Sequence, residues 1–281
     1  MNLAGKNIKC IAVDLDHTVI NSDGTMSDAT RTVIEQAIAE GIEIVPVSGR
    51  AFATFPESIG QIKGISYAVT SNGAAIYNKK TGERIHGVAI EYADLHSILD
   101  AFAHYFHNGQ ITYEAFVDGV AYGGREYVEH PEAFGVPERN VAYVQSTRKP
   151  VDDIIAFLSE HEEELDSLDI VAADTALYQK IEEQIPLVTK SVYTTSAVSC
   201  RLEISHKNSG KATGLAYVLK LLDITPEETV AFGDGDNDAE MLAFAGLGVA
   251  MENATENCKA AADIVCDCYK NDGVARFLYG F

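Results

Sequence analysis

The chain has 281 residues and a formal net charge of −21, from 42 acidic against 21 basic residues. This charge argues against nucleic-acid binding and against docking on anionic membranes, because both depend on basic side chains that neutralise phosphates. Hydrophobic residues make up 47% of the chain and are spread along it, which excludes extended disorder and favours one or two folded domains. The charge should also repel anionic substrates, so any anion site must be built locally.

The five cysteines, an odd number, show no CxxC or Cys/His spacing of a zinc site. We therefore expect reduced thiols, as in a cytoplasmic protein. No apolar leader follows Met1, and no apolar run approaches the roughly 20 residues that a membrane span needs. The expectation is a soluble, cytoplasmic protein without a membrane segment, and no protein partner is implied.

The N-terminal third alternates apolar runs with helical patterns. In chain order we expect a strand at 8–13, a helix between Ser27 and Gly41, a strand at 42–47, a helix at 51–59 and a strand at 67–70. Strands that are apolar throughout and that alternate with helices predict a parallel sheet covered on both faces.

The pattern changes in the middle of the chain. A turn at 79–82 joins two strand-like pieces, and Asp118-Gly119 between strand residues is typical of a β-hairpin. Apolar periodicity then predicts helices at 92–107, 151–165 and 174–185 and a strand at 168–172. We interpret this stretch, residues 83–193, as an inserted α+β domain.

The first pattern resumes in the C-terminal third. We expect a helix from Ser209-Gly210-Lys211 to Leu222, a strand at 229–232, a helix at 236–245 and strands at 247–251 and 263–266. The chain therefore reads as one α/β domain, a doubly wound, Rossmann-like parallel sheet formed by residues 1–82 and 194–281, which the insert interrupts.

Two acidic clusters directly follow predicted strands. Asp14-Leu15-Asp16-His17-Thr18 follows the first strand, and Gly233-Asp234-Gly235-Asp236-Asn237-Asp238 follows a late one. Ligands of open parallel sheets bind at the carboxyl ends of the strands, so neighbouring strands would bring these carboxylates into one crevice. Such a cluster needs a cation, and oxygen ligands with access to water suit Mg²⁺. Either cluster alone could be a solvated turn, because Asp and Asn are ordinary turn residues.

Three better-known motifs are matched in part and then fail at a required position. They are the dinucleotide fingerprint, the calcium loop and the P-loop. The failing positions are, in that order, Asp238, Ala239 with Ala245, and Ser205 with Ala212.

The residue types suit phosphoryl transfer. Asp14 and Asp16 can supply a nucleophile, which would form an aspartyl phosphate, and a proton donor that later activates water. Mg²⁺ would offset the repulsion between the carboxylate and the phosphoryl group. Ser48 and the Gly49 amide can donate hydrogen bonds to phosphoryl oxygens, and Lys211 adds positive charge at a predicted helix N-terminus.

These residues resemble, in order, the four motifs of haloacid-dehalogenase-superfamily phosphatases. Asp14-Leu15-Asp16-His17-Thr18 resembles the first motif, DxDx[TV], Ser48-Gly49-Arg50 the second, Lys211 the third, and Gly233-Asp234-x-x-Asn237-Asp238 the fourth. The insert between the second and third motifs, together with Ser71-Asn72-Gly73-Ala74, is similar to the Cof-type subfamily. The resemblance covers essentially the whole chain, and it implies a parallel-sheet core and a mobile cap, formed by the insert, that supplies substrate specificity.

The resemblance also implies a role for each matched residue. Asp14 is expected to be the nucleophile and a Mg²⁺ ligand, and Asp16 the general acid/base with its backbone carbonyl on the metal. Asp234 is expected to bind the metal, and Asp238 to act on it through water or neighbouring contacts. The expected phosphate-binding groups are the Leu15 amide, Ser48, Gly49, Lys211 and Asn237.

The implied activity is Mg²⁺-dependent hydrolysis of a small phosphorylated metabolite, and a sugar phosphate is favoured. A phosphomutase would share the aspartyl phosphate, and a non-catalytic sensor of phosphate ligands would keep the fold without turnover. In the insert, basic residues could pair with an anionic substrate or be solvated charges, and aromatic residues could stack on a ring or pack. They are Arg125, Arg139, Arg148 and Lys149, and Tyr113, Phe116 and Tyr122.

His17 stands where the commoner family form has glycine. A lone histidine is seldom a ligand, so we interpret it as a loop side chain that faces solvent or the cap.

Overall fold

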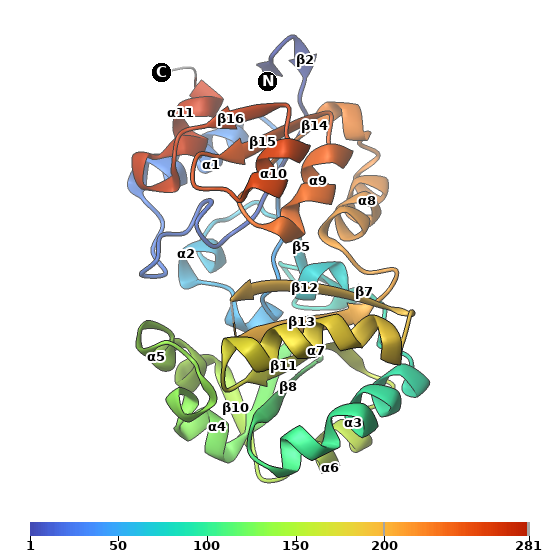
Figure 1. Ribbon diagram of the computed structural model, residues 1–281. Coiled ribbons are helices and arrows are strands. Elements are labelled where there is room, and N and C mark those ends of the chain that lie inside the picture. The colour runs from blue at the N-terminus through green and yellow to red at the C-terminus, as the bar shows by residue number, and fades with distance from the viewer. Residues whose placement is uncertain (199, 280–281) are drawn as a thin grey trace. The chain divides into compact units, whose positions relative to one another are not determined.

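Strand β3 (Cys10–Val13) forms inside a parallel sheet because its four residues are apolar and buried on both faces. In the computed structural model, which describes residues 1–198 and 200–279, this sheet has the order β16-β15-β14-β3-β4 (Figure 1). Its other strands are β4 (Glu43–Pro46), β14 (Thr229–Gly233), β15 (Leu247–Met251) and β16 (Ile264–Cys266). All four pairings are parallel, so the predicted α/β fold class is confirmed.

Helices cover both faces of this sheet because the side chains of β3 alternate between two apolar cores. Ile11 and Val13 pack with residues of α1 and α11, whereas Cys10 and Ala12 pack with residues of α8, α9 and α10. The helices are α1 (Asp28–Ala39), α8 (Lys211–Leu222), α9 (Ala239–Phe244), α10 (Glu256–Ala261) and α11 (Gly273–Tyr279).

The segment predicted as a helix at 51–59 is interrupted. It forms a 3₁₀ turn, η1 (Phe52–Thr54), and a single helical turn, α2 (Glu57–Gly60). Pro56 stands between them and disfavours helical backbone at the residue before it. The prediction of one continuous helix is therefore wrong.

The strand predicted at 67–70 forms, but it belongs to a separate sheet. It is β5 (Tyr67–Thr70), which pairs antiparallel with β6 (Ala75–Asn78), and β7 (Arg84–Gly87) completes this three-stranded sheet. A single parallel bridge, between Val47 and Val69, links β5 to the chain after β4. The remaining elements nearby are the short hairpin of β1 (Asn2–Leu3) and β2 (Lys6–Asn7) and the 3₁₀ turns η2 (Ser71–Gly73), η4 (Pro226–Glu228), η5 (Asp236–Asp238) and η6 (Tyr269–Asn271).

The insert builds a second sheet, with the order β10-β9-β8-β11-β13-β12. Its strands are β8 (Ile111–Val117), β9 (Val120–Gly124), β10 (Arg148–Val151), β11 (Leu165–Ala172), β12 (Val192–Val198) and β13 (Arg201–His206). Its helices are α3 (Tyr92–His107), α4 (Arg125–Glu129), α5 (Glu138–Thr147), α6 (Ile154–Glu160) and α7 (Thr175–Val188), with the 3₁₀ turn η3 (Pro131–Phe134). Residues of α3, α6 and α7 form the apolar core on one face of this sheet (Figure 1).

Local turn chemistry explains where two predictions in the insert hold and fail. The hairpin predicted at Asp118-Gly119 is confirmed: it joins β8 to β9, and both residues have positive φ, 47° and 72°. The helix predicted at 151–165 is too long. Asp153 accepts hydrogen bonds from the backbone N–H groups of Ile155 and Ala156, at 3.0 Å each, so α6 begins only after it.

The insert ends later than predicted. The chain divides into one unit of Met1–Arg50, Phe55–His86 and Gly210–Phe281 and a second unit of Ala51–Thr54 and Gly87–Ser209. The predicted boundaries, 83–193 for the insert and 194–281 for the return to the core, are therefore corrected. Residues after 193 stay in the second unit because β12 and β13 are paired strands of its sheet. Among the described residues, no helix has the length and hydropathy to cross a membrane.

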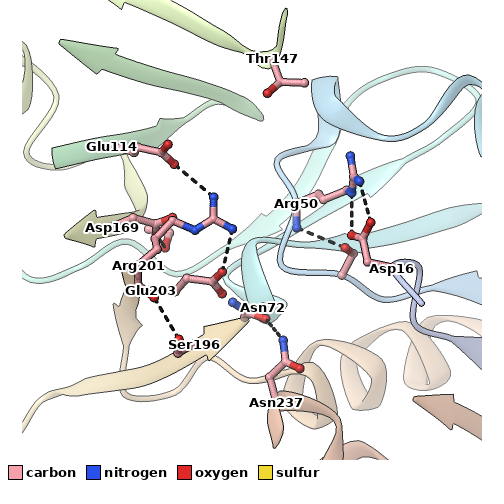
Figure 2. A network of polar contacts seen from close by, with 12 residues as sticks. Asp16, Arg50, Asn72, Glu114, Thr147, Asp169, Ser196, Arg201, Glu203 and Asn237 are labelled. Atoms are coloured by element: carbon pink, nitrogen blue, oxygen red, sulfur yellow. Dashed lines mark hydrogen bonds and ion pairs between the residues drawn. The ribbon is translucent and has the colours of Figure 1, made fainter. Parts of the chain in front are cut away.

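The face of the second sheet opposite its apolar core carries a buried ion network. Glu114, Asp169 and Glu203 lie side by side because they are cross-strand partners on β8, β11 and β13. Arg148 donates two hydrogen bonds to Glu114, from Nε at 3.0 Å and from Nη2 at 2.8 Å. Arg201 lies within 3.7 Å of Glu114 and 3.3 Å of Glu203 (Figure 2). Arg148 is therefore paired inside the domain, which neither the substrate-binding nor the surface interpretation anticipated.

This network predicts a large loss of stability when Glu114 is neutralised. Burial raises the pKa of Glu114, but the charges of Arg148 and Arg201 outweigh burial, so its pKa lies below its ordinary value of 4.5. We expect Glu114→Gln to lower the free energy of unfolding by about 3–5 kcal/mol, because Arg148 would stay charged in a buried site without a carboxylate. Urea denaturation at pH 7 measures this loss.

The same variant should show a defined pH dependence. Because the folded pKa is lowered, the stabilisation is fully present above the ordinary pKa of 4.5 and is lost as the pH falls through the folded value. The difference between wild type and Glu114→Gln should therefore shrink in acid. The control is Asp152→Asn, which breaks an exposed pair with Arg125 and should change nothing measurable. Equal losses from the two variants would contradict the prediction.

Candidate active site

The two acidic clusters meet because the strands that precede them are neighbours. β3 pairs with β14, with Val13 opposite Phe232, and the Asp14 N–H donates to the Phe232 carbonyl at 2.9 Å. Asp14 continues β3 and Asp234 continues β14, so both lie at the carboxyl edge of one sheet, where open α/β sheets bind ligands. The two strands are therefore neighbours, which is what the meeting of the two acidic clusters requires.

A buried ammonium group joins two of the carboxylates. Lys211 Nζ lies 2.7 Å from Asp14 Oδ1 and 2.6 Å from Asp238 Oδ1. Lys211 is the first residue of α8 and directly follows Gly210. The N-terminus of this helix therefore lies next to the acidic cluster, and the Lys211 side chain extends into the cluster. All three side chains are buried. Asp14, Asp234 and Asp238 each offer a carboxylate oxygen, and these three oxygens lie within 4.8 Å of one another.

The charges in this cluster do not balance. Burial, followed by the charge of Asp238, raises the pKa of Asp234 to about 7. Burial also raises the pKa of Asp14, and the three neighbouring carboxylates add to this, although the charge of Lys211 opposes the shift. Burial lowers the pKa of Lys211, but the charges of Asp14 and Asp238 outweigh it and hold the amine protonated. Only one ammonium group lies among the three carboxyl groups of Asp14, Asp234 and Asp238, and the raised pKa values of Asp14 and Asp234 reflect this shortage of positive charge.

A divalent cation fits this donor set. Hard cations such as Mg²⁺ take carboxylate oxygens, and oxygens that share an ion lie within about 4–5 Å of one another. The three oxygens here satisfy that spacing and carry an excess of negative charge. The chemistry and spacing of the donors thus match a divalent cation.

Asp238 also shapes the loop that carries Asp234. Its Oδ2 accepts hydrogen bonds from the backbone N–H groups of Asp234 at 3.0 Å and Gly235 at 2.9 Å. The loop can close this tightly only beside a glycine, because a Cβ at Gly233 would lie 2.4 Å from the Asp238 Cβ. Asp238 therefore links Lys211 to the backbone of the second acidic cluster.

Asp16 lies outside this cluster of three carboxylates. Its carboxylate accepts two hydrogen bonds from Arg50, from Nε at 2.8 Å and from Nη2 at 2.6 Å (Figure 2). Burial raises the pKa of Asp16, but the hydrogen bonds and charge of Arg50 outweigh burial and lower it. Arg50 belongs to the predicted second motif, but its pairing with Asp16 was not predicted from the sequence. Its partners are 34 residues apart in the chain.

The turn after Asp16 explains the glycine of the commoner family form. His17 has a left-handed backbone, with φ at 59°, a conformation that glycine adopts without strain. Its ring is exposed and lies 5.2 Å from that of Tyr269, which agrees with a loop side chain. Asn253 was not predicted from the sequence as a site residue. It donates from Nδ2 to the His17 carbonyl at 3.1 Å and to Asp234 Oδ2 at 3.0 Å. Asn253 therefore ties the two acidic loops together.

Besides Lys211, the residues predicted to bind phosphate come from three segments of the chain. Leu15, next to Asp14, is buried, and its carbonyl accepts the N–H groups of residues 18–20, which closes the first acidic turn. Ser48 is buried, and its Oγ accepts the Arg50 N–H at 3.2 Å, with Gly49 between them. Asn237 donates from Nδ2 to Asn72 Oδ1 at 3.0 Å (Figure 2). In the sequence, Asn72 was marked only as part of Ser71-Asn72-Gly73-Ala74, the stretch that is similar to the Cof-type subfamily, and no role was predicted for it.

Known proteins resemble this chain over nearly its whole length. The model of the haloacid dehalogenase-like hydrolase family matches residues 11–278. The phosphatase YwpJ of Bacillus subtilis is 30% identical over 96% of this chain and 99% of its own. The 5-amino-6-(5-phospho-D-ribitylamino)uracil phosphatase YcsE of the same organism is 28% identical over 97% of this chain and 95% of its own.

Solved structures agree with the sequence comparison. The structure of a haloacid dehalogenase-like hydrolase from B. subtilis superposes with a TM-score of 0.80, at 28% identity over 97% of this chain and 99% of its own. The chain therefore belongs to the haloacid dehalogenase-like hydrolases, as its four motifs predicted, and to the Cof-type phosphatase branch that the insert and Ser71-Asn72-Gly73-Ala74 predicted.

Proposed function

We propose that the chain hydrolyses a small phosphate monoester, a sugar phosphate or a related phosphorylated metabolite, through an aspartyl phosphate on Asp14, and that Mg²⁺ is its metal. One observation carries this proposal: a buried carboxylate at the end of a central strand has an ammonium group at 2.7 Å and two further carboxylates beside it. Phosphoryl transfer needs this combination of nucleophile, counter-charge and cation site.

Asp14 would be the nucleophile, and Lys211 would orient it. The hydrogen bond from Nζ fixes Asp14 Oδ1 and favours the ionised carboxylate that attack on phosphorus requires. Bond formation between an Asp14 oxygen and phosphorus, with loss of the alcohol, gives the acyl phosphate. The metal would be held by Asp14, Asp234, Asp238 and the Asp16 carbonyl. When bound, it supplies positive charge against the carboxylates and the phosphoryl oxygens.

Asp16 would transfer the protons in both half-reactions. It would donate a proton to the leaving alcohol and then remove one from the water that hydrolyses the acyl phosphate. The ionised form that Arg50 stabilises suits the second step. For the first step, the Arg50 pair must open so that Asp16 can carry a proton.

Phosphoryl oxygens would be held by Ser48, the amides of Leu15 and Gly49, Asn237 and Lys211. Backbone and side-chain donors that are already in place stabilise charge without reorganisation. The sugar-phosphate class is supported by the name of one relative, which describes a phosphorylated ribityl chain. In this proposal the insert, as a mobile cap, selects among such substrates.

The nucleophile assignment predicts loss of turnover without loss of fold. We expect Asp14→Asn to lower kcat by at least about a thousandfold, because an amide cannot form the acyl phosphate. Phosphate release from a panel of sugar phosphates measures kcat, and circular dichroism checks the fold. Asp23→Asn, an exposed acid of the same loop, is the matched control and should keep full activity. Full activity of Asp14→Asn would refute the proposal, and phosphate returned to the substrate would indicate a mutase.

The metal assignment predicts dependence on a divalent cation. We expect chelation with EDTA to abolish activity and added Mg²⁺ to restore it. Asp234→Asn should raise the Mg²⁺ concentration for half-maximal activity by at least about tenfold, since a neutral amide is a poorer ligand than a carboxylate. Calorimetric titration with Mg²⁺ gives the affinity independently.

The control for the metal site is Asp236→Asn. Asp236 is an exposed acid in the same loop, and its carboxylate accepts a hydrogen bond from Thr255 at 2.5 Å. This variant should bind Mg²⁺ as wild type does. Unchanged turnover in metal-free buffer would contradict the metal assignment.

A further inference from the structure

The turn at Ser71-Asn72-Gly73 has an unusual backbone. Its three residues have φ angles of 48°, 52° and 88°, so two consecutive non-glycine residues adopt the left-handed conformation. That conformation is uncommon for residues other than glycine, and asparagine is among those that tolerate it best. The turn is buried, and strained backbone of this kind persists only where surrounding contacts hold it.

Asn72 contacts three of the four segments to which we assign phosphate binding. Its backbone N–H donates to the Ser48 carbonyl at 3.0 Å, and its carbonyl accepts the Gly210 N–H at 2.8 Å. Its side-chain Oδ1 accepts a hydrogen bond from Asn237 Nδ2 at 3.0 Å (Figure 2). The residue after Gly210 is Lys211. One buried residue therefore joins the second, third and fourth motifs.

The turn packs directly against the backbone that precedes α8. A Cβ at Gly73 would lie 2.0 Å from the Gly210 carbonyl oxygen, so the two backbones touch directly. Gly210 itself has φ at 134°, which lies in the left-handed range. The turn and the start of α8 are thus fixed against each other, and the Asn72 side chain is presented to Asn237 from a rigid base.

We propose that Asn72 is a positioning residue, whose side-chain carbonyl orients the Asn237 amide toward the bound phosphoryl group. Oδ1 takes one of the two Nδ2 protons of Asn237 and so directs the other. The inference rests on the proposed function, because it takes from it the phosphate-binding role of Asn237. It assigns Asn72 no contact with the reacting atoms.

The decisive variant is Asn72→Gly. Glycine accepts the left-handed backbone without strain and can keep both backbone hydrogen bonds, so the variant removes the side-chain bond to Asn237 without straining the turn. We expect inorganic phosphate, titrated calorimetrically in the presence of Mg²⁺, to bind about tenfold more weakly, the effect of one hydrogen bond. For p-nitrophenyl phosphate, kcat/KM should fall by a similar factor.

The matched control is Asp223→Gly. Asp223 is exposed at the C-terminus of α8 with φ at 55° and ψ at 42°, nearly the backbone of Asn72. Both variants place glycine in nearly the same backbone conformation, so Asp223→Gly controls for the backbone effect of the substitution. Asp223→Gly should bind phosphate as wild type does.

A double-variant cycle tests whether Asn72 acts through Asn237. If it does, Asn72→Gly combined with Asn237→Ala should bind phosphate no more than about twofold worse than Asn237→Ala alone. Wild-type phosphate affinity in Asn72→Gly, or effects of the two substitutions that multiply, would overturn the inference. So would an Asn72→Gly variant that fails to fold, since the side chain would then serve folding. An inactive wild type would instead refute the proposed function.

Discussion

The site depends on a single buried cation, the ammonium group of Lys211. Asp14 and Asp238 come from different strand ends and could not share a buried space as bare carboxylates. Lys211 bridges them at 2.7 and 2.6 Å, and Asp238 in turn holds the backbone at Asp234. Lys211 thus connects the two acidic loops at their buried side, and the start of α8 fixes the position of its backbone.

The net charge of −21 takes on a different meaning beside this arrangement. Four of the acidic residues belong to the candidate site: Asp14, Asp16, Asp234 and Asp238. Each of these carboxylates forms an ion pair with a lysine or arginine or accepts a side-chain hydrogen bond. In the second unit, Arg148 and Arg201 form ion pairs with three further carboxylates on one face of the sheet. The buried acids are organised in networks, so global charge says little about the local field.

Sequence patterns predicted what depends on neighbours in the chain. The apolar strand before Asp14, the hairpin at Asp118-Gly119 and the order of the motifs all follow from local residue types. The pairing of β5 could not be predicted in this way, because the apolar pattern of a strand does not indicate which sheet the strand joins. The late boundary of the insert was missed because the sequence pattern did not predict β12 and β13, the two strands that extend the second sheet to His206. Buried pairs such as Arg50 with Asp16 join distant positions, and only the folded chain brings them together.

The composition of the second unit bears on how such proteins can be recombined. This unit consists of Gly87–Ser209 and of Ala51–Thr54, a short segment that lies earlier in the chain. Residues Phe55–His86, which separate the two segments, belong to the first unit. Ala53 donates to the Gly119 carbonyl at 2.8 Å, and Ala51 packs with Phe116 and Ala121. The second unit is therefore not formed by one continuous segment of the chain. A chimaera that exchanges only the long segment would separate these partners, whereas one that carries both segments would keep the domain whole.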